Sequence, residues 1–308
     1  MLSAPYMVPF ADRFVPELES AGCVVTVAKV AERLEEEDLL RLMPAMDGII
    51  CGDDRLSRRV IEALPRLKVI AKWGTGVDSI DRQACLDRGV VLCNTPDAFS
   101  TPVADSTMAY VLAFARRTVA MDQAMHAGEW RKIPGRALHE CTLGIVGMGN
   151  IGRAVARRAR AFGMRILGCD IRPIPPGVLA ESSVEPVELG TLLSASDFVT
   201  IHCDLNQTSR HLLRAETLAM LKPGAVVLNL ARGPCVDEPA LVEALRSGRA
   251  GGAALDVFEE EPLPASSPLR GLPNVMMAPH NSNSSPTAWE RVHRSTIDQL
   301  VSGLRASA

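Results

Sequence analysis

The stretch Leu143-Gly144-Ile145-Val146-Gly147-Met148-Gly149-Asn150-Ile151-Gly152 decides the fold of this chain. A short apolar run ends in the pattern G-x-G-x-x-G, and a run with helical character follows at residues 153–161. A second apolar run, residues 164–169, stops at Asp170. This order of strand, glycine turn, helix, strand and acidic residue predicts a dinucleotide-binding unit of the Rossmann type.

Each glycine of the pattern has a separate physical task. Gly147 permits the tight turn, Gly149 lets a pyrophosphate approach the backbone, and Gly152 lets the helix pack closely on the strand. The helix N-terminus offers unpaired N–H groups to the phosphates. Glycines also mark ordinary turns, but both strands and the acidic residue are in register, which favours the cofactor site. The predicted contacts are Gly147, Gly149, Asn150, Ile151, Gly152 and, on the ribose, Asp170.

The bulk composition narrows the class of protein. A chain of 308 residues suits two domains of about 150 residues each. The net charge of -3 gives no reason to expect nucleic acid or a membrane surface as a partner. The first ten residues, MLSAPYMVPF, lack the basic start and apolar core of a signal peptide. Eight cysteines without a C-x-x-C pair fit a reducing cytoplasm, and no cluster has the ligand spacing of a zinc site, so no metal is expected.

Strand and helix patterns alternate along the first hundred residues, which predicts a parallel sheet covered on both faces. The expected strands lie near residues 23–27, 47–52, 67–73 and 90–94, and the expected helices at 10–21, 34–43, 58–64 and 80–88. Residues 101–127 are predicted to form one long helix. Further strands are expected at 198–203, 225–230, 250–257 and 275–278, with helices at 186–194, 215–221, 239–247 and 287–304.

The predicted fold class is therefore α/β, with two doubly wound parallel-sheet domains. Residues 1–100 and 285–308 would form a flavodoxin-like substrate domain, and residues 101–284 an inserted Rossmann domain that binds NAD. We expect the substrate in the cleft between the domains.

Polar residues that can do chemistry follow three apolar strands. They lie in Asn229-Leu-Ala-Arg232-Gly, in Leu255-Asp256-Val-Phe-Glu259-Glu260-Glu261-Pro262, and in Ala278-Pro279-His280. The carboxyl ends of the strands are where ligands bind in a doubly wound sheet. An arginine there can hold a carboxylate by two parallel hydrogen bonds, and a histidine can donate and accept protons near neutral pH. A nearby glutamate would orient the imidazole and favour its protonated form.

These motifs, in this order, closely resemble the D-isomer-specific 2-hydroxyacid dehydrogenase family, which includes phosphoglycerate, glycerate and D-lactate dehydrogenases. The resemblance covers nearly the whole chain, from Lys68-Val-Ile-Ala-Lys-Trp-Gly-Thr-Gly-Val-Asp78 and Asn94-Thr-Pro96 to the terminal helix. It implies an NAD-dependent enzyme that interconverts a small 2-keto acid and its D-2-hydroxy acid.

The resemblance also implies residue roles. Arg232 would bind the substrate carboxylate and polarise the keto group, and His280, paired with Glu261, would be the general acid/base. The backbone of Thr75 and Gly76 would meet the carboxylate from the other domain. Ala231, Asp256 and His202 would contact the cofactor, with Asp256 at the nicotinamide carboxamide. The family has H-x-P-L where this chain has His202-Cys203-Asp204-Leu205, so His202 is equally well explained as a strand-end residue.

Departures from the family bear on the substrate. Phosphoglycerate-type relatives carry an arginine in the stretch that reads Cys51-Gly52-Asp53-Asp54-Arg55 here. Two carboxylates in a pocket would repel a phosphate, although Arg55 could turn inward. The polar run Asn281-Ser282-Asn283-Ser284-Ser285 after His280 favours a polar substrate tail.

Two alternatives to the dehydrogenase remain open. A non-catalytic NAD(H)-sensing protein can use the same fold, although Arg232, Glu261 and His280 argue against it. A formate dehydrogenase is disfavoured because formate oxidation needs no proton exchange, and therefore no Glu261. For the assembly we expect a homodimer through the 101–127 helix and the neighbouring cofactor-domain surface. The apolar set of this helix is broader than one stripe: Val103, Met108, Val111, Leu112, Phe114 and Val119. The alternative is that both sides of the helix pack within one subunit.

Overall fold

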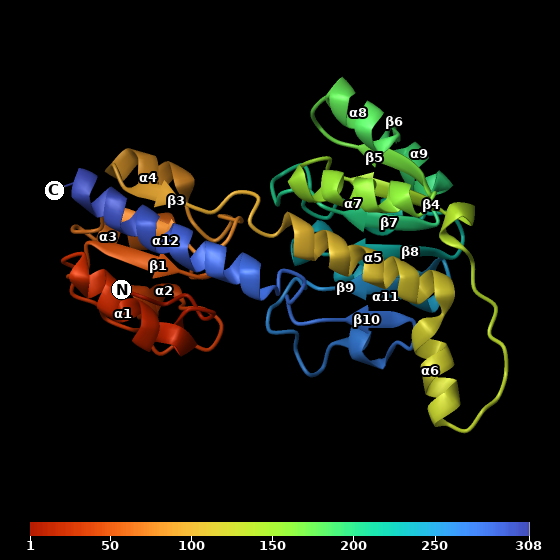
Figure 1. Ribbon diagram of the computed structural model, residues 1–308, viewed down its shortest axis with the longest axis horizontal. Coiled ribbons are helices and arrows are strands. Elements are labelled where there is room, and N and C mark those ends of the chain that lie inside the picture. The colour runs from red at the N-terminus through yellow and green to blue at the C-terminus, as the bar shows by residue number, and fades with distance from the viewer. Residues whose placement is uncertain (308) are drawn as a thin grey trace. The chain divides into compact units, whose positions relative to one another are not determined.

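The computed structural model describes residues 1–307, and the chain divides into two compact units, each of which is described by itself. Met1–Phe99 and Ser285–Ala308 make up the first unit, and Ser100–Ser284 the second. Figure 1 shows that each unit contains a sheet with helices packed on it.

The first unit contains a parallel sheet in the order β1-β2-β3. Its strands are β1 (Gly48–Cys51), β2 (Val69–Lys72) and β3 (Val91–Cys93). Its helices are the 3-10 turn η1 (Val8–Phe10), α1 (Ala11–Ser20), α2 (Glu36–Leu42), α3 (Arg58–Ala63), α4 (Arg82–Arg88) and α12 (Pro286–Ala306).

Helix α12 begins one residue before the predicted start. The Ser285 side chain accepts a hydrogen bond from the backbone N–H of Ala288, and Pro286 takes the first helical position. The helix packs directly on the sheet through two glycines. A Cβ on Gly48 would lie 2.9 Å from Leu300, and a Cβ on Gly303 would lie 2.9 Å from Val69. A larger residue at either position would push the helix off the strands.

The second unit contains a parallel sheet in the order β10-β9-β8-β7-β4-β5-β6. The strands are β4 (Thr142–Val146), β5 (Arg165–Cys169), β6 (Val184–Pro186), β7 (Phe198–Ile201), β8 (Ala225–Asn229), β9 (Ala250–Leu255) and β10 (Val275–Met277). Strands β5 and β6 extend the sheet on one side of β4, and β7 to β10 extend it on the other side, so the order of strands reverses between β4 and β7. That reversal makes the carboxyl ends of these two strands the expected position for a ligand.

The helices of this unit are α5 (Ser100–Arg116), α6 (Thr118–His126), α7 (Asn150–Ala161), α8 (Pro176–Ser182), α9 (Leu189–Ala195), α10 (Ala215–Leu218) and α11 (Glu238–Arg246). Three 3-10 turns complete it: η2 (Leu138–Glu140), η3 (Gly233–Cys235) and η4 (Pro268–Gly271).

Two neighbouring residues of β4 show that the sheet is covered on both faces. A Cβ on Gly144 would touch Leu192 of α9 at 2.5 Å, while Ile145 lies against Gly152 of α7. Because successive residues of a strand point to opposite faces, α7 and α9 cover opposite faces of β4. This is the doubly wound arrangement that the sequence predicts.

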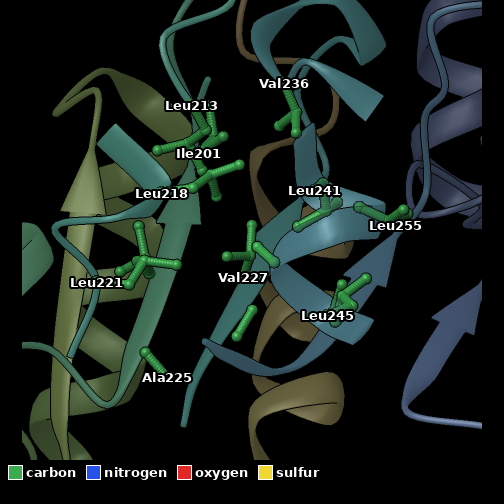
Figure 2. Packing of buried hydrophobic residues seen from close by; sticks show 14 of the residues in the cluster. Ile201, Leu213, Leu218, Leu221, Ala225, Val227, Val236, Leu241, Leu245 and Leu255 are labelled. Carbon is green, nitrogen blue, oxygen red and sulfur yellow. The ribbon is translucent and has the colours of Figure 1, made fainter. Parts of the chain in front are cut away.

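The core of the second unit gathers apolar side chains from β7, β8, β9 and α11 (Figure 2). Val227 and Leu255 from the strands lie against Leu241 and Leu245 from the helix, and all four are buried. Burial of a large apolar side chain contributes about 1.5–3 kcal/mol to the stability of the fold. This core therefore holds in place the strand ends from which the polar loops begin.

The prediction of one helix over residues 101–127 is wrong. Helix α5 ends at Arg116, Arg117 adopts a left-handed φ of 56°, and α6 then begins. The carbonyl of Ala115, which a continuous helix would use internally, accepts the N–H of Arg136 at 2.7 Å instead. A chain segment that is distant in sequence therefore ends the helix.

Other elements depart from the sequence prediction at the sheet edges. The strand expected at residues 23–27 is reduced to a single bridge between Leu2 and Val27, and Leu2 also bridges to Ile50. Helix α8 and strand β6 were not predicted, and the helix expected at 186–194 begins only at Leu189.

Candidate active site

The dinucleotide loop lies at the end of β4 and has the geometry that its glycines require. Gly147 has a φ of 94°, and a Cβ there would lie 2.6 Å from the Cys203 nitrogen. A Cβ on Gly152 would lie 2.0 Å from the Gly147 oxygen. A Cβ on Gly149, in contrast, would meet nothing within 4 Å, so space remains open at the N-terminus of α7. The loop and its open space fit the phosphates of a dinucleotide.

Asp170, at the end of β5, is joined to this loop. Its Oδ2 accepts the N–H of Met148 at 2.8 Å, and its Oδ1 accepts the N–H of Arg172 at 2.9 Å. The Arg172 side chain is 80% exposed, with its Nε 3.9 Å from the carboxylate. Each carboxylate oxygen has further acceptor capacity, so Asp170 can still accept hydrogen bonds from ribose hydroxyl groups.

His202 is buried at the end of β7 and is not a surface residue. Its Nε2 lies 2.9 Å from the Thr200 hydroxyl, and within the described chain its buried Nδ1 has no hydrogen-bond partner. Burial lowers the pKa of His202 to about 3, so the imidazole is neutral at physiological pH. A neutral, buried imidazole fits a packing role at the end of β7. The contact of His202 with the cofactor stays a prediction.

The loop after β8 holds Arg232. The Asn229 side chain bridges this loop, because it donates to the Arg232 carbonyl at 2.9 Å and accepts the Ala231 N–H at 3.2 Å. The guanidinium in turn donates to the Ala231 carbonyl at 2.8 Å. A Cβ on Gly233 would lie only 1.8 Å from the oxygen of Phe258. Only glycine lets the Arg232 loop pack this closely on the loop that follows β9.

His280 and Glu261 form the pair that the sequence predicts. The His280 Nδ1 lies 3.0 Å from Glu261 Oε2, and both side chains are about three-quarters buried. The other Glu261 oxygen accepts the N–H of Phe258 at 2.9 Å. The backbone of His280 has a left-handed φ of 50°, and its N–H donates to the Asp256 carbonyl at 2.8 Å. A histidine whose Nδ1 is held by a carboxylate can exchange protons with a substrate through its Nε2.

Asp256 is buried beneath the His280 loop. Its two carboxylate oxygens accept the N–H groups of Asn281 and Ser282 at 2.8 and 2.9 Å. Burial, and then the negative charge of Asp256, raise the pKa of Tyr110 on α5, which places that phenol near the carboxylate. The Ser282 hydroxyl is buried and has no hydrogen-bond partner within residues 1–307.

Sequence reasoning did not assign Tyr110 or Ser282 to the site. The polar run after His280 was the available signal for Ser282, but no pattern could connect Tyr110 on α5 to Asp256. Both residues add polar groups around the acid that the resemblance places at the nicotinamide.

Glu259 and His211 form a contact beside the loop that carries Glu261. The His211 Nε2 lies 2.6 Å from Glu259 Oε1. The Glu259 N–H donates to Glu238 Oε1 at 2.6 Å. Burial raises the pKa of Glu238. The hydrogen bond from the Glu259 backbone lowers that pKa, and the negative charge of Glu259 raises it further. These contacts fix the loop that carries Glu261.

In the first unit, Thr75 and Gly76 follow β2 in a loop held by side chains. The Thr75 hydroxyl donates to the Thr95 carbonyl at 2.9 Å, and the Asn94 amide donates to the Thr75 carbonyl at 2.6 Å. The preceding Gly74 has a φ of 117°. Side-chain hydrogen bonds to backbone carbonyls therefore shape the loop, and neither bond uses the backbone N–H of Thr75 or Gly76.

The two aspartates near this loop differ from the sequence expectation. Asp54 is buried and accepts hydrogen bonds from the Ser3 hydroxyl at 2.6 Å and the Leu34 N–H at 2.6 Å, so it serves the core and does not line a pocket. Asp53 lies 3.0 Å from the ammonium of Lys72, whose side chain is 5% exposed. Arg55 is turned toward Glu35 at 3.4 Å.

Among residues 1–307, no group of three or more histidine, cysteine, aspartate or glutamate side chains could hold a metal ion. None of the helices within the same residues is long and apolar enough to cross a membrane.

The comparisons with known proteins agree on one family. Residues 108–282 match the model of the D-isomer specific 2-hydroxyacid dehydrogenase, NAD binding domain. The chain is 39% identical to D-3-phosphoglycerate dehydrogenase of Methanocaldococcus jannaschii over 96% of its own length and 56% of that protein. It is 37% identical to hydroxypyruvate reductase of Thermotoga maritima over 89% of the chain and 90% of that protein.

Among solved structures, D-lactate dehydrogenase from Aquifex aeolicus, complexed with NAD and lactic acid, superposes with a TM-score of 0.86 at 25% identity. The match covers 99% of this chain and 95% of that one. The chain spans about half the length of the phosphoglycerate dehydrogenase and nearly all of the other two proteins.

The chain belongs to the D-isomer specific 2-hydroxyacid dehydrogenase family. Its second unit contains the NAD binding domain of that family, and NAD is its cofactor. The predictions of family, α/β fold class and cofactor are confirmed, and the names of the three relatives agree with the prediction of an NAD-dependent oxidoreductase.

Proposed function

We propose that the protein is an NAD-dependent dehydrogenase that interconverts a small 2-keto acid and its D-2-hydroxy acid. The observation that supports this best is the His280–Glu261 pair at 3.0 Å, in loops on the same sheet as the dinucleotide loop. A protein that only sensed NAD(H) would need no histidine held by a buried carboxylate.

Each residue then has a role. Arg232 binds the substrate carboxylate and polarises the keto oxygen, and the backbone N–H groups of Thr75 and Gly76 bind the same carboxylate from the first unit. The bound cofactor supplies the hydride that reaches the carbonyl carbon. His280 donates a proton from Nε2 to the carbonyl oxygen, and Glu261 holds the imidazolium in orientation.

Asp256 and its neighbours bind the nicotinamide carboxamide. The Asp256 oxygens already accept two backbone N–H groups, and each retains a further lone pair for an amide N–H. The Ser282 hydroxyl and the Tyr110 phenol supply further polar groups in the same place. Gly147, Gly149, Asn150, Ile151 and Gly152 bind the pyrophosphate, with Ala231, His202 and Asp170 completing the cofactor site.

The substrate class that fits best is a short, unphosphorylated 2-keto acid with a polar tail. Lys72, the cation next to the Thr75 loop, is paired with Asp53, and Arg55 is turned toward Glu35. A phosphate would have to compete with Asp53 for Lys72. The Thermotoga maritima relative is named for hydroxypyruvate, a substrate of this class.

Initial rates of NADH oxidation across a panel of keto acids test the proposal. The panel comprises glyoxylate, hydroxypyruvate, pyruvate, bulkier 2-keto acids and 3-phosphohydroxypyruvate. Hydroxypyruvate or glyoxylate should give the highest kcat/KM, and the phosphorylated acid a lower one. Tight NADH binding without turnover of any acid would favour the NAD-sensing alternative.

Arg232→Lys provides the matched variant. A lysine ammonium cannot make the planar two-point contact with a carboxylate, so KM should rise and kcat should fall. We expect a loss of about 100-fold in kcat/KM, comparable to the removal of one transition-state donor. Kinetics close to those of the parent would show that the substrate is anchored elsewhere.

We also propose that the protein acts in the cytoplasm as a homodimer, without nucleic acid or membrane partners. All eight cysteines are free thiols, as a reducing compartment requires.

A further inference from the structure

His211 lies in the segment between β7 and α10 and contacts both the loop that carries Arg232 and the loop that carries Glu261. Its backbone N–H donates to the Pro234 carbonyl at 2.8 Å, two residues after Arg232. Its Nε2 lies 2.6 Å from Glu259 Oε1, two residues before Glu261. Because an ionised carboxylate can only accept a hydrogen bond, Nε2 is the donor. One residue therefore connects the two loops.

Backbone pairing attaches the segment of His211 firmly to the loop after β8. The Leu213 N–H donates to the Cys235 carbonyl at 3.1 Å, and the Asp237 N–H donates to the Leu213 carbonyl at 2.8 Å. Leu213 also forms a parallel bridge with Val236, and both side chains are buried. The His211 side chain therefore extends to Glu259 from a base that is fixed to the Arg232 loop.

Glu259 transmits this contact to Glu261. The Glu259 N–H donates to Glu238 Oε1 at 2.6 Å, and its Oε2 accepts the Glu238 N–H at 3.4 Å. The preceding N–H, that of Phe258, donates to Glu261 Oε1 at 2.9 Å, while Glu261 Oε2 lies 3.0 Å from His280 Nδ1. Glu261 is thus bonded to the backbone next to Glu259, so a movement of Glu259 displaces the carboxylate that orients His280.

The backbone of His211 favours a functional reason for this contact. Its φ of 47° lies in the left-handed region, as does the φ of 50° at His280. Residues other than glycine rarely adopt this conformation, and such strained residues are concentrated at functional sites, where the surrounding contacts hold them. In this conformation each histidine meets a carboxylate, Glu259 in the first case and Glu261 in the second.

Stability alone does not explain the contact. The side chains of His211 and Glu259 are 38% and 30% exposed. Partly exposed pairs of this kind contribute little to the free energy of unfolding. A contact that adds little stability can still fix the direction of a loop, and that direction is what Glu261 needs.

We propose that His211 is a positioning residue for proton transfer, because by holding Glu259 it keeps Glu261 in place to orient His280. This proposal rests on the proposed function, in which His280 donates the proton from Nε2. His211 touches neither substrate nor cofactor in this role and acts through Glu261. When its side chain is shortened, the Glu261 loop loosens while the backbone bond to Pro234 remains, so kcat should fall more than KM changes.

Three variants separate the side-chain contact from other effects. His211→Asn shortens the side chain, and asparagine accepts the left-handed conformation, so the backbone can stay as it is. His211→Gln keeps an N–H donor at about the reach of Nε2. His139→Asn is the matched control, since His139 is an exposed histidine on η2 of the same unit.

Steady-state kinetics with the best keto acid give the first test. We expect kcat of His211→Asn to fall by about tenfold, because displacement of a catalytic group by about 1 Å can cost up to 100-fold. KM, NADH affinity and the midpoint of urea unfolding should stay close to those of the parent. His211→Gln should recover most of kcat, and His139→Asn should behave as the parent does. A parental kcat in His211→Asn, or an equal loss in both His211 variants, would overturn the proposal.

A double variant shows whether His211 acts through Glu261. In a Glu261→Ala background the carboxylate that His211 would position is gone, so His211→Asn should cause little further loss of kcat. The full loss in both backgrounds would mean that His211 affects the site by another route, and the proposal would be wrong.

Hydrogen exchange followed by mass spectrometry gives a test that needs no turnover. The N–H groups of Phe258 and Glu259 are both hydrogen-bonded in this loop, so the peptide that contains residues 256–262 should exchange faster in His211→Asn and at the parental rate in His139→Asn. If the parent turns over no keto acid, the proposed function fails, but exchange still reports the loop. Faster exchange in His211→Asn then supports the positioning of Glu261 by His211, and unchanged exchange contradicts it.

Discussion

At the scale of single residues, the roles of His280 and Glu261 can be separated. His280→Ala removes the proton donor, and the contacts that His280 makes with Glu261 and the Asp256 carbonyl lie in the loop after β9. We expect kcat to fall by about 10²–10⁴-fold. NADH affinity, measured by fluorescence titration, should change little. A large loss of NADH affinity would instead place His280 in the cofactor site.

Glu261→Gln tests the charge of the pair separately from its geometry. Glutamine can still hydrogen-bond to His280 Nδ1, but it no longer favours the imidazolium. Reduction of the keto acid needs the protonated imidazole, so activity should be lost at a lower pH than in the parent. The measurement is the alkaline limb of the pH profile of kcat/KM. Superimposable profiles would show that the Glu261 charge does not act on His280.

Asp170 should direct the choice between NADH and NADPH. Its carboxylate is fixed by the N–H groups of Met148 and Arg172, and it would repel a ribose 2′-phosphate. The parent should therefore prefer NADH by about tenfold or more in kcat/KM, since a like-charge contact near a protein surface costs several kcal/mol. Asp170→Ser should reduce that preference, and Arg172→Ala should not. Equal efficiency of the parent with both cofactors would contradict the assignment.

The sequence predicts the catalytic residues better than it predicts their surroundings. Arg232 and His280 stand in short motifs directly after strands, so their position on the sheet follows from local order. Tyr110 and Ser282 gain their interest from Asp256, a neighbour that is distant in sequence and that no spacing reveals. Asp54 shows the converse, because its buried bonds to Ser3 and Leu34 remove it from the site in which its charge suggested a role.

At the scale of elements, the close approach of two loops depends on one glycine. Gly233→Ala would place a Cβ 1.8 Å from the Phe258 oxygen, which is backbone and cannot move aside cheaply. The loops carrying Arg232 and Glu261 would separate. We expect a loss of about 1–3 kcal/mol in the free energy of unfolding, together with a fall in kcat.

Gly149→Ala is the matched control for this prediction. A Cβ there meets nothing within 4 Å, so the free energy of unfolding should stay close to that of the parent. The same methyl group would occupy the open space at the start of α7, and NADH affinity should fall. Denaturant unfolding and NADH titration distinguish the two variants, and equal stability losses would contradict the contrast.

The elements that sequence periodicity predicted well are those buried on one or both faces, such as β4, β8 and α12. Those that it missed depend on distant contacts. Ala115 gives its carbonyl to Arg136, so the apolar periodicity that continues into α6 does not reveal the break. Strand β6 has three residues at the sheet edge, too few for a hydrophobic pattern.

At the scale of the whole molecule, the exposed apolar side chains bear on the proposed homodimer. Of the set expected to make a subunit contact, Val103, Met108 and Val111 are buried within the single chain, so that part of the α5 surface is already covered. Exposure continues instead along α6 and the segment after it, where Val119 is 43% and Trp130 is 90% exposed. Large contiguous apolar patches on a protein surface mark interaction sites, and a patch over α6 and the following segment would be such a site.

We therefore expect a homodimer in which α6 and the residues up to Trp130 are covered by a second copy. Light scattering at micromolar concentration should give twice the mass of the chain, and Trp130 fluorescence should shift to the red on dilution below the dissociation constant. Trp130→Ser combined with Val119→Ser should weaken the dimer, since loss of a large aromatic anchor at an interface costs about 2 kcal/mol or more. Phe162→Ser, at an exposed position after α7, is the control and should leave the mass unchanged. A stable monomer of the parent at micromolar concentration would show that these side chains remain in solvent.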